Sequence, residues 1–364
     1  MTKNKIPVGI LGATGTVGQR LITLLQDHPW FEVVCVAASD KSATKTYGEA
    51  VKGRWIQKEL IPKSVSPLKV LSVEKDIETI TRQVRLVFCA IDADKEFIKK
   101  IEEEYAKAGL GVVSNNSAHR WTPDIPVIMP EINPEHLEII PIQRKNRGWT
   151  TGCIITKPNC SIQSYVPLLN AWKDFNPQKI IVSTYQAVSG AGKTLESWPE
   201  MVDNVMPFID GEEEKSEKEP SKILSKINKR KNGEFVLNNE IKISSNCIRV
   251  PVSDGHMAAI NIQFSPKVSK EQLVKALVNF KNPLDILDLP SAPKPFLKYF
   301  EEKNRPQTKL DRDLGNGMTI SIGRLREDLV LGWKCVALSH NTIRGAAGGS
   351  ILNAELLVKK GYIS

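Results

Sequence analysis

The chain has 364 residues, a length that predicts two domains. Its 41% hydrophobic and 25% charged residues are typical of a globular protein and exclude a disordered chain, a collagen or a simple coiled coil. The formal net charge of +9 favours a lysine-rich surface and suits small anionic substrates. We expect no nucleic-acid partner, because no basic stretch is interleaved with aromatic residues and no zinc or helix-turn-helix signature is present.

The six cysteines point to a reducing compartment. They form no Cys-x-x-Cys pair and are too sparse for a disulfide framework in a chain of this length. The first residues contain no secretory hydrophobic segment, and no apolar run approaches the ~20 residues of a membrane helix. We therefore expect a cytoplasmic protein without a membrane partner and without a metal site.

Strands and helices alternate over the first 150 residues. Short apolar runs predict strands at 6–11, 31–38, 86–91 and 111–113. Helical periodicity appears at 17–25 and 94–107. This order predicts an α/β fold with a Rossmann-like, doubly wound parallel sheet.

The pattern changes in the second part of the chain. Longer runs rich in β-branched residues, at 179–188, 241–252 and 257–264, predict a mixed or antiparallel sheet in a second, α+β domain. Residues 211–232 are dense in charge and are predicted to form a solvated helix or loop. Helical character returns at 343–360.

A glycine-rich turn follows the first predicted strand. Residues 9–18 read Gly-Ile-Leu-Gly-Ala-Thr-Gly-Thr-Val-Gly, a variant of the dinucleotide fingerprint. Glycines let the backbone approach a pyrophosphate, and the following helix offers free N–H groups and the positive end of its dipole. Because the motif lies between a predicted strand and a predicted helix, it indicates a dinucleotide site.

The end of the second predicted strand should select between NAD and NADP. Ser39, Lys41 and Ser42 carry hydroxyl and cationic groups that suit a 2′-phosphate, whereas Asp40 would suit a free ribose hydroxyl. The first three residues favour NADP, and Asp40 keeps NAD open.

Residues 187–194 resemble a Walker A loop, because they end in Gly-Ala-Gly-Lys-Thr. That motif requires a glycine where this chain has Ala187. The segment 189–192, Ser-Gly-Ala-Gly, therefore predicts a turn beside the dinucleotide rather than a site of nucleotide hydrolysis.

A cysteine, a histidine and an arginine have the chemistry for covalent catalysis. Cys160 precedes a predicted helical stretch at 165–172, and a helix N-terminus lowers the pKa of a thiol, so we predict a thiolate nucleophile beside N–H groups that could hold an oxyanion. His256 follows a turn-forming Asp-Gly pair and can take the thiol proton and return it to an oxyanion. Arg249 can bind a carboxylate with two hydrogen bonds.

With these motifs the chain resembles aspartate-semialdehyde dehydrogenase of the fungal and archaeal branch over essentially its whole length. The resemblance rests on Gly-Ala-Thr-Gly-Thr-Val-Gly at 12–18, Asn-Asn-Ser-Ala-His-Arg at 115–120, Pro-Asn-Cys-Ser at 158–161, Ser-Gly-Ala-Gly at 189–192, Glu-Glu-Lys at 213–215, Arg-Val-Pro-Val-Ser-Asp-Gly-His at 249–256 and His-Asn-Thr-Ile-Arg-Gly-Ala-Ala-Gly at 340–348.

The resemblance implies a reaction. It is the NADPH-dependent reductive dephosphorylation of L-4-aspartyl phosphate to L-aspartate 4-semialdehyde through a thioester on Cys160, a step toward lysine, threonine and methionine. His256 would be the acid/base, and Gln186 would orient the thioester. Arg249 would hold the substrate α-carboxylate.

The resemblance also implies the remaining site residues. Glu212 would hold the substrate amino group, although Glu213 and Glu214 stay open for this role. The implied phosphate ligands are Arg120, Asn116 and Lys215. The implied NADP contacts are Gly12, Thr14, Gly15, Thr16, Val17, Ser39, Ser42, Ser189 and Asn341.

The family's last helix packs on the cofactor domain. This implies an NADP-binding domain of residues 1–157 plus 343–364 and a catalytic and dimerisation domain of residues 158–342. Relatives form homodimers or homotetramers. Two residues depart from a common family pattern, in which threonine follows both the Asn-Cys-Ser segment and the catalytic histidine; this chain has Ile162 and Met257.

Other functions compete with this one. N-acetyl-glutamyl-phosphate reductase shares the chemistry, but its nucleophile region typically reads Gly-Cys-Tyr-Pro. Malonyl-CoA reductases of some archaea share the branch and the thioester. A Cys/His hydrolase would not need the N-terminal glycine loop. A non-catalytic NADP sensor or DNA-binding regulator would not need the set of Cys160, His256 and Arg249.

Overall fold

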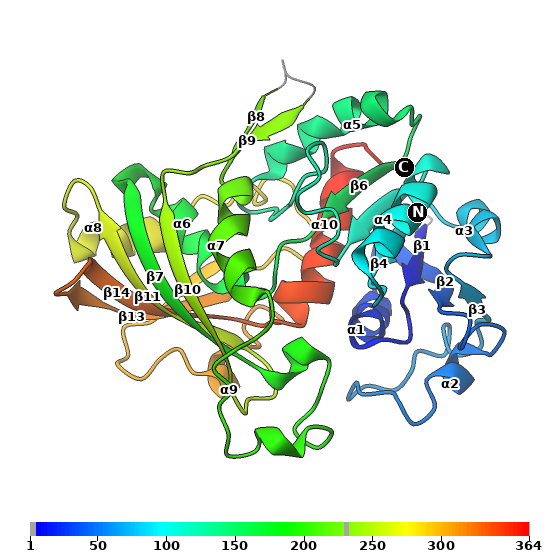
Figure 1. The fold of residues 1–364 in the computed structure, drawn as a ribbon, viewed down its shortest axis with the longest axis horizontal. Helices are drawn as coiled ribbons and strands as arrows, with labels where there is room; N and C mark the ends of the chain where they lie inside the picture. The colour runs from blue at the N-terminus through cyan, green and yellow to red at the C-terminus, as the bar shows by residue number, and fades with distance from the viewer. Residues whose placement is uncertain (1–4, 229–232, 364) are drawn as a thin grey trace.

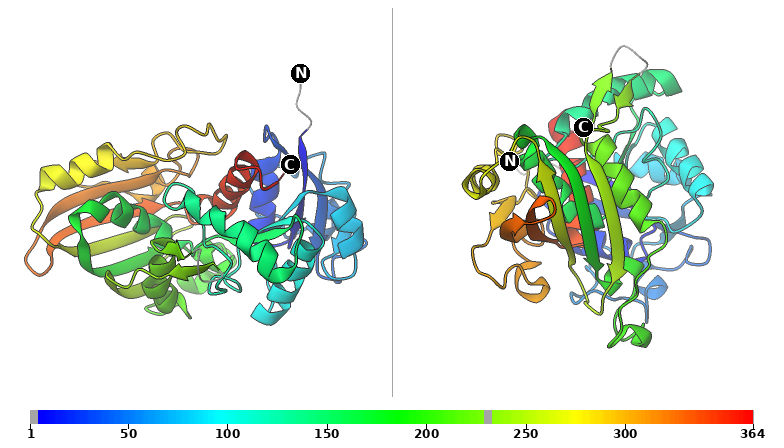
Figure 2. Two further views of the ribbon diagram at one scale, coloured as in Figure 1. Left: turned by 90° about the horizontal axis from the view of Figure 1, so that it is seen from above. Right: turned by 60° about the vertical axis from the view of Figure 1, so that its left-hand side comes forward.

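Two six-stranded sheets organise the chain, and the computed structural model describes residues 5–228 and 233–363 (Figure 1). The first sheet lies on the right of that view and the second on the left. The C-terminal helix α10 (Gly348–Lys359) stands between them in Figure 1 and in the view from above in Figure 2.

The first sheet is parallel throughout and has the strand order β3-β2-β1-β4-β5-β6. Its strands are β1 (Ile6–Leu11), β2 (Phe31–Ala38), β3 (Val70–Ser72), β4 (Leu86–Cys89), β5 (Gly111–Ser114) and β6 (Cys153–Thr156). This is the strand order of a Rossmann fold, so the predicted Rossmann-like, doubly wound parallel sheet is confirmed. The predicted strands at 6–11 and 31–38 are confirmed to the residue.

Helices cover both faces of this sheet. They are α1 (Thr16–Leu25), α2 (Tyr47–Ala50), α3 (Ile77–Gln83), α4 (Lys95–Lys107) and α5 (Ile140–Arg147). Successive residues of β4 point to opposite faces, so Phe88 packs in a core with α1 and α10, whereas Val87 packs in a core with α3 and α4. The predicted helix at 94–107 is α4, whose first turn is capped by the Asp94 carboxylate, which accepts the N–H of Phe97 at 2.9 Å.

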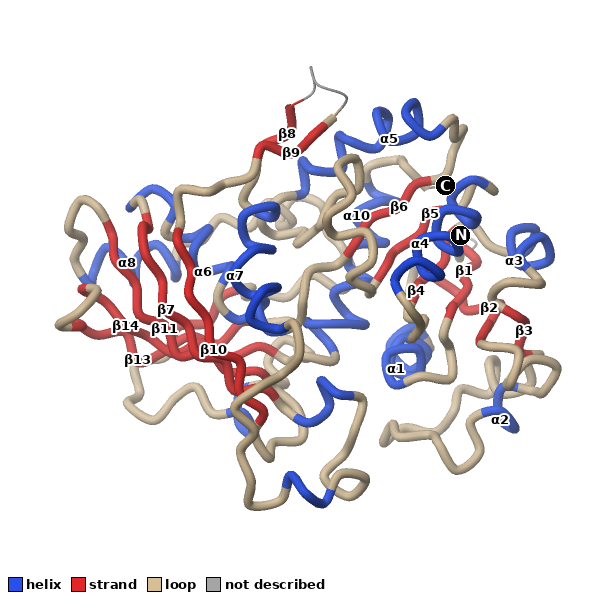
Figure 3. Tube along the Cα trace, viewed as in Figure 1, coloured by secondary structure: helices blue, strands red, loops and turns tan. Residues whose placement is uncertain are grey.

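The second sheet is mixed, as its strand pattern predicted, and has the order β10-β7-β11-β14-β13-β12. Its outer pairs β10/β7 and β12/β13 are parallel, and the inner pairs are antiparallel. Figure 3 shows the strands of this sheet in red on the left of the view. The strands are β7 (Pro177–Gln186), β10 (Lys242–Arg249), β11 (His256–Phe264), β12 (Leu297–Tyr299), β13 (Ile320–Asp328) and β14 (Gly332–Ser339). The small hairpin of β8 (Lys226–Asn228) and β9 (Glu234–Val236) stands apart.

The helices of this part are α6 (Val166–Ala171), α7 (Glu212–Ile223), α8 (Lys270–Val278) and α9 (Thr308–Asp311). Apolar side chains of α6 and α8 pack with Ile180, Val182 and Ile260 in a second core. Helix α7 lies on the same face, because Ser216 is within 3.6 Å of Cys247. Among the described residues the opposite face of β7 is open, and Ile181 and Tyr185 are 44% and 37% exposed there.

The predicted solvated character of 211–232 is wrong for the part that forms α7. Glu219 and Lys222 are buried. Burial of these charges is tolerated because Glu219 pairs with Arg120 and Lys222 donates to three backbone carbonyl oxygens. The end of that stretch, residues 229–232, lies outside the described residues.

The predicted helix at 343–360 consists of two parts. A π-helical turn (Ile343–Ala347) comes first, and α10 follows it. Ile351, Leu352 and Leu356 of α10 are buried in the core of the first sheet. The exact domain boundaries stay a prediction. No helix in residues 5–228 and 233–363 is long and apolar enough to span a membrane.

Candidate active site

The glycine loop passes between β1, β4 and α1 with no room for side chains. Gly12 has a φ of 82°, and a Cβ there would lie 2.3 Å from the carbonyl oxygen of Ala90. A Cβ on Gly18 would lie 2.3 Å from the carbonyl oxygen of Gly12. The free N–H groups at the start of α1 therefore reach the surface beside this loop.

A cavity of about 430 Å³ opens at the carboxyl ends of these strands. Its lining includes Gly12, Thr14, Gly15, Ser39 and Lys41. A site at this edge of a doubly wound sheet fits a dinucleotide, whose pyrophosphate the loop and helix would hold. Thr16 and Val17 form the first turn of α1 and are partly exposed beside it.

Asp40, the residue that would suit the free ribose hydroxyl of NAD, is already bound to two other side chains. Its carboxylate accepts the hydroxyl of Ser72 at 2.7 Å and pairs with Lys75 at 2.6 Å, and the hydrogen bond from Lys75 lowers the pKa of Asp40. Ser39 and Lys41 are exposed, and Ser42 is buried under the same turn. The arrangement leaves a hydroxyl and a cation toward the cavity, which favours NADP.

Segments that connect or follow the strands of the second sheet complete this region. Asn341 donates to the hydroxyl of Ser189 at 2.8 Å and accepts the N–H of Gly255 at 2.8 Å. The Thr16 hydroxyl lies 3.5 Å from the carbonyl oxygen of Gly192. The turn at 189–192 therefore lies beside the glycine loop, where the sequence placed it.

Cys160 lies at the start of a four-residue 3-10 turn (Ser161–Ser164). It is partly exposed, whereas the other five cysteines are buried. Burial and the Glu212 carboxylate raise the pKa of its thiol to about 11, although Lys157 and Arg249 act in the opposite direction. The predicted lowering of this pKa is wrong for the ligand-free protein, because burial of the thiol and the Glu212 carboxylate outweigh the cations around it.

His256 begins β11 and is fully buried. Its Nδ1 accepts the N–H of Ala187 at 3.1 Å, so the proton of the neutral ring is on Nε2. Nε2 has no hydrogen-bond partner among the described residues. Burial, assisted by the charge of Arg249, lowers the pKa of His256 to about 3. The ring is therefore a neutral donor ready for an oxygen atom in the site.

Gly190 packs against His256 and Arg249 so closely that a side chain at this position would contact both. A Cβ at this position would lie 2.8 Å from Nη1 of Arg249 and 3.1 Å from Nε2 of His256. Arg249 is anchored by a 2.8 Å hydrogen bond from Nη1 to the carbonyl oxygen of Ala187, and burial lowers its pKa. The rest of its guanidinium is available for a carboxylate.

Of the three consecutive glutamates, the structure brings Glu212 to Cys160. The Glu212 carboxylate accepts hydrogen bonds from Nδ2 of Asn159 at 2.9 Å, from Nζ of Lys215 at 2.9 Å and from Nε2 of Gln186 at 3.3 Å. Glu213 instead accepts the N–H of Cys247 at 3.2 Å, and Glu214 is exposed. Glu212, Gln186 and Lys215 thus form one polar wall of the site.

The structure does not bring all three implied phosphate ligands to Cys160. Arg120 is buried and near enough to Cys160 to act on its thiol, and its Nη1 donates to Glu219 at 2.6 Å. Lys215 is held beside the site by Glu212, whose carboxylate accepts a hydrogen bond from its Nζ at 2.9 Å. The amide nitrogen of Asn116 points elsewhere, to Glu102 at 3.3 Å and to the sulfur of Cys89 at 3.4 Å. The structure does not bring Asn116 to Cys160.

Three further residues were given no role by sequence reasoning. Asn159 donates to Glu212, and Glu219 accepts hydrogen bonds from Arg120 and from the N–H of Asn159. The charge of Lys157 acts on the Cys160 thiol. A signal for Glu219 existed, because Glu212, Ser216 and Glu219 follow the i, i+4, i+7 spacing of one helix face.

The two departures from the family pattern lie away from the reacting groups. Ile162 is fully buried in the core with α6 and α8. Met257 pairs with Tyr185, on the face of β11 opposite to His256.

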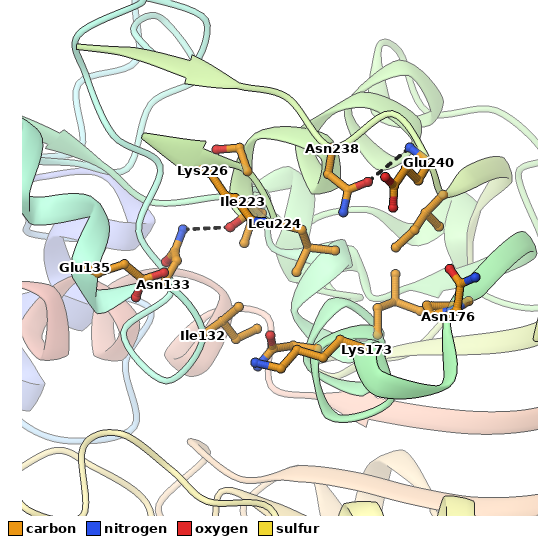
Figure 4. A pocket seen from close by; sticks show the side chains of 15 residues that line it. Ile132, Asn133, Glu135, Lys173, Asn176, Ile223, Leu224, Lys226, Asn238 and Glu240 are labelled. Carbon is orange, nitrogen blue, oxygen red and sulfur yellow. Dashed lines mark hydrogen bonds between the residues drawn. The ribbon is translucent and has the colours of Figure 1, made fainter. Parts of the chain in front are cut away.

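Figure 4 shows a second cavity, of about 310 Å³, which Cys160 does not line. Ile132, Glu135, Lys173, Leu224 and Asn238 are among its lining residues, and none of the predicted site residues lines it. In residues 5–228 and 233–363, no group of three His, Cys, Asp or Glu is arranged to hold a metal ion.

The chain matches two protein-family models. Residues 7–140 match the semialdehyde dehydrogenase NAD binding domain, and residues 166–344 match the semialdehyde dehydrogenase dimerisation domain. The fold and the site thus define a semialdehyde dehydrogenase.

Relatives narrow the class. The aspartate-semialdehyde dehydrogenase of Archaeoglobus fulgidus is 44% identical over 98% of this chain and 99% of its own. That of Saccharomyces cerevisiae is 40% identical over 98% of both chains. The crystal structure of the Candida albicans enzyme with NADP matches with a TM-score of 0.88 and 37% identity, over 99% of this chain and 100% of that one. The chain belongs to the aspartate-semialdehyde dehydrogenase family.

Proposed function

We propose that this protein reduces L-4-aspartyl phosphate to L-aspartate 4-semialdehyde with NADPH, through a thioester on Cys160. One observation carries the proposal. The partly exposed Cys160 lies near enough to Arg249 and Glu212 for their charges to act on its thiol, and the turn at 189–192, which packs against Arg249, also contacts the glycine loop. A guanidinium and a carboxylate together suit an α-amino acid, whose own carboxylate and ammonium have the opposite charges.

Four side chains bind and orient the substrate. Arg249 holds the α-carboxylate, and Glu212 accepts the α-ammonium group. Gln186 lies beside Glu212 and orients the acyl group. Arg120 and Lys215 bind the phosphate, and Asn116 joins them only if its amide turns away from Glu102.

The Cys160 thiolate attacks the acyl carbon, so a carbon–sulfur bond forms and the carbon–oxygen bond to phosphate breaks. Arg120 and Lys215 stabilise the charge of the departing phosphate. NADPH, when bound, supplies the hydride that reduces the thioester. His256 donates a hydrogen bond from Nε2 to the developing oxyanion and keeps its proton. Collapse of the thiohemiacetal oxyanion then breaks the carbon–sulfur bond, releases the aldehyde and restores the thiolate.

The test follows NADPH formation by the purified protein with L-aspartate semialdehyde, with and without phosphate. We expect phosphate-dependent turnover that Cys160→Ala abolishes, while its circular dichroism spectrum is unchanged. Turnover by Cys160→Ala would remove the nucleophile from the mechanism.

N-acetyl-glutamate semialdehyde and malonyl-CoA serve as the competing substrates. Glu212 argues against both, because neither compound carries a free ammonium group for its carboxylate. Turnover confined to either would replace the proposed substrate. Binding of NADPH without any turnover would favour a sensor.

We also propose a homodimer formed through the open face of the second sheet, around Ile181 and Tyr185. A homotetramer is the other outcome of the same test, a mass measurement in solution. The six unpaired cysteines support a reducing compartment such as the cytoplasm.

A further inference from the structure

A buried lysine to which the proposed mechanism gives no role reaches from α7 to the segment that contains Arg120. Lys222 lies in the last turn of α7, and its residue surface is only 3% exposed. Its Nζ donates three hydrogen bonds, to the carbonyl oxygens of Arg120 at 2.7 Å, Thr122 at 2.9 Å and Ile125 at 2.8 Å. The ring of Phe235 lies 5.0 Å from the same nitrogen. Lys222 thus binds three backbone groups that lie 97 to 102 residues away in the chain.

The three acceptors determine which form of Lys222 fits this position. An ammonium group has three hydrogens, whereas the neutral amine has two hydrogens and a lone pair. Burial lowers the pKa of Lys222 to about 7, but the amine would turn its lone pair toward the third carbonyl oxygen. The carboxylates of Asp124 and Glu219 also favour the positive charge. The hydrogen-bond geometry therefore fits the ammonium form.

The segment that Lys222 holds has no regular secondary structure. Residues 115–126 form neither helix nor strand, so turns and side-chain donors fix the backbone here instead of a hydrogen-bond ladder. On one side, Arg147 and Gln143 of α5 each donate to Asp124 at 2.9 Å, the first to its carboxylate and the second to its carbonyl oxygen. Lys222 holds the other side from α7. Loss of the lysine nitrogen would therefore release one side of this segment.

The side chain of Arg120 is held by three further hydrogen bonds. Its Nε donates to the carbonyl oxygen of Lys157 at 3.0 Å, its Nη1 to Glu219 at 2.6 Å and its Nη2 to the carbonyl oxygen of Asn115 at 3.4 Å. A guanidinium group has five N–H hydrogens, so one on each terminal nitrogen remains for an anion. The direction of these two hydrogens depends on where the backbone of Arg120 lies.

Helix α7 holds Arg120 at both ends. Glu219 binds its guanidinium group and Lys222 binds its carbonyl oxygen. These two residues are neighbours on the helix surface, because they are three positions apart. The first turns of the same helix carry Glu212 and Lys215. One helix thus sets the position of both proposed phosphate ligands relative to the carboxylate that is proposed to bind the substrate ammonium group.

We propose that Lys222 is a positioning residue for phosphate binding. Its ammonium group fixes the backbone of residues 120–125 and thereby directs the two remaining hydrogens of the Arg120 guanidinium toward the phosphate oxygens. The proposal rests on the proposed role of Arg120 as a phosphate ligand. Lys222 touches neither the substrate nor the reacting atoms, so its effect passes through Arg120.

The first test compares the two substrates of the oxidative assay in Lys222→Ala. The kcat/KM for phosphate should fall about tenfold, because Arg120 loses its alignment, whereas the KM for the semialdehyde should change by less than about twofold. Steady-state kinetics with each substrate varied in turn measures this difference. An unchanged kcat/KM for phosphate in a folded variant, or an equal loss for both substrates, would overturn the proposal.

Chemical rescue separates hydrogen bonding from charge. Lys222→Ala removes Cγ, Cδ, Cε and Nζ, which together have the size of propylammonium. Added propylammonium should therefore restore most of the lost kcat/KM for phosphate. Tetramethylammonium has the same charge but no N–H group, so it should restore none. Absence of rescue by propylammonium, or equal rescue by both ions, would overturn the proposal.

Lys218→Ala is the matched control. Lys218 lies on the same helix, but it is exposed to solvent. Its substitution removes one positive charge at a similar place in the chain and should leave the kcat/KM for phosphate unchanged, with or without propylammonium. A loss as large as that of Lys222→Ala would show a general effect of charge, and would overturn the proposal.

A second variant covers the case in which Lys222→Ala does not fold. Lys222→Met keeps the length and the apolar part of the side chain but lacks the three hydrogens. It should lower the kcat/KM for phosphate to a similar extent, and propylammonium should not rescue it because the space is filled. In an Arg120→Met background the same substitution should have no further effect. Additive losses in the double variant would mean that Lys222 does not act through Arg120.

A binding measurement separates this proposal from the proposed function. Isothermal titration calorimetry with inorganic phosphate requires no turnover. The phosphate Kd should rise about tenfold in Lys222→Ala and return toward the original value with propylammonium. This result without turnover of the semialdehyde would contradict the proposed function alone. An unchanged Kd in an active enzyme would overturn the role of Lys222 alone.

Discussion

At the scale of single residues, the chemistry of the site depends on which atoms carry a hydrogen. The N–H of Ala187 occupies Nδ1 of His256 and so fixes the second ring nitrogen as a donor. Burial keeps the ring neutral, because its pKa falls from 6.5 to about 3. A neutral donor suits an oxyanion, since it stabilises developing negative charge without bringing a second cation beside Arg249.

The protonation state of His256 is directly testable. Because the pKa is lowered, the neutral form should persist from pH 9 down to about pH 4.5, and protonation should appear only below that. Nitrogen-15 NMR of the imidazoles, assigned with His256→Gln, measures both the charge and the tautomer. An imidazolium at pH 6, or a hydrogen on Nδ1, would contradict this prediction.

Arg249 is suited to bind the substrate carboxylate because its planar guanidinium group can donate two parallel hydrogen bonds. Arg249→Lys keeps the positive charge but loses one of two parallel hydrogen bonds, which are worth about 1.5 kcal/mol each when a charged group takes part. The KM for the semialdehyde should rise about tenfold with a smaller change in kcat. Steady-state kinetics measures this, and an unchanged KM would remove Arg249 from the substrate site.

At the scale of elements, α7 is the helix that connects the polar groups of the site. One face of it presents Glu212 to Asn159 and Glu219 to Arg120. The charge that suggested a solvated segment is therefore partly internal. Charged residues can be buried here because each has a partner of opposite charge or a hydrogen-bond acceptor.

The pair of Glu219 and Arg120 gives a prediction about stability. Glu219→Gln keeps the shape of the side chain but leaves a buried guanidinium without its counter-charge, so the free energy of unfolding should fall by about 3 kcal/mol. Urea unfolding measures the change. Glu214→Gln, on the exposed side of the same helix, is the control and should change it by less than about 0.5 kcal/mol. Equal effects of the two substitutions would contradict the assignment.

At the scale of the whole molecule, the described helices cover one face of the second sheet, and within residues 5–228 and 233–363 the other face of β7 is open. Ile181 and Tyr185 lie on the other face, where their exposure has a cost in water that a second copy would remove. The substitutions Ile181→Asp and Tyr185→Asp together should therefore yield a monomer by light scattering. Leu329→Asp, on a fully exposed turn, should leave the mass unchanged. A monomeric unsubstituted protein would contradict the proposed dimer.

Much of the fold could be predicted from local patterns. Strand periodicity predicted β1 and β2 to the residue, and Asp94 marked the start of α4, because apolar alternation and helix caps are local properties. Asn116 shows the limit of such prediction. A sequence motif does not specify which neighbouring group its side-chain amide binds. The structure directs that amide to Glu102.

The sequence by itself determined the chemistry that is available. It supplied a glycine loop that no other residue type could form, a cysteine that ends up partly exposed, and a histidine and an arginine on strand ends. Only the tertiary structure decided how these groups are charged. The thiol pKa is raised rather than lowered, because burial and the distance between charges depend on segments far apart in the chain.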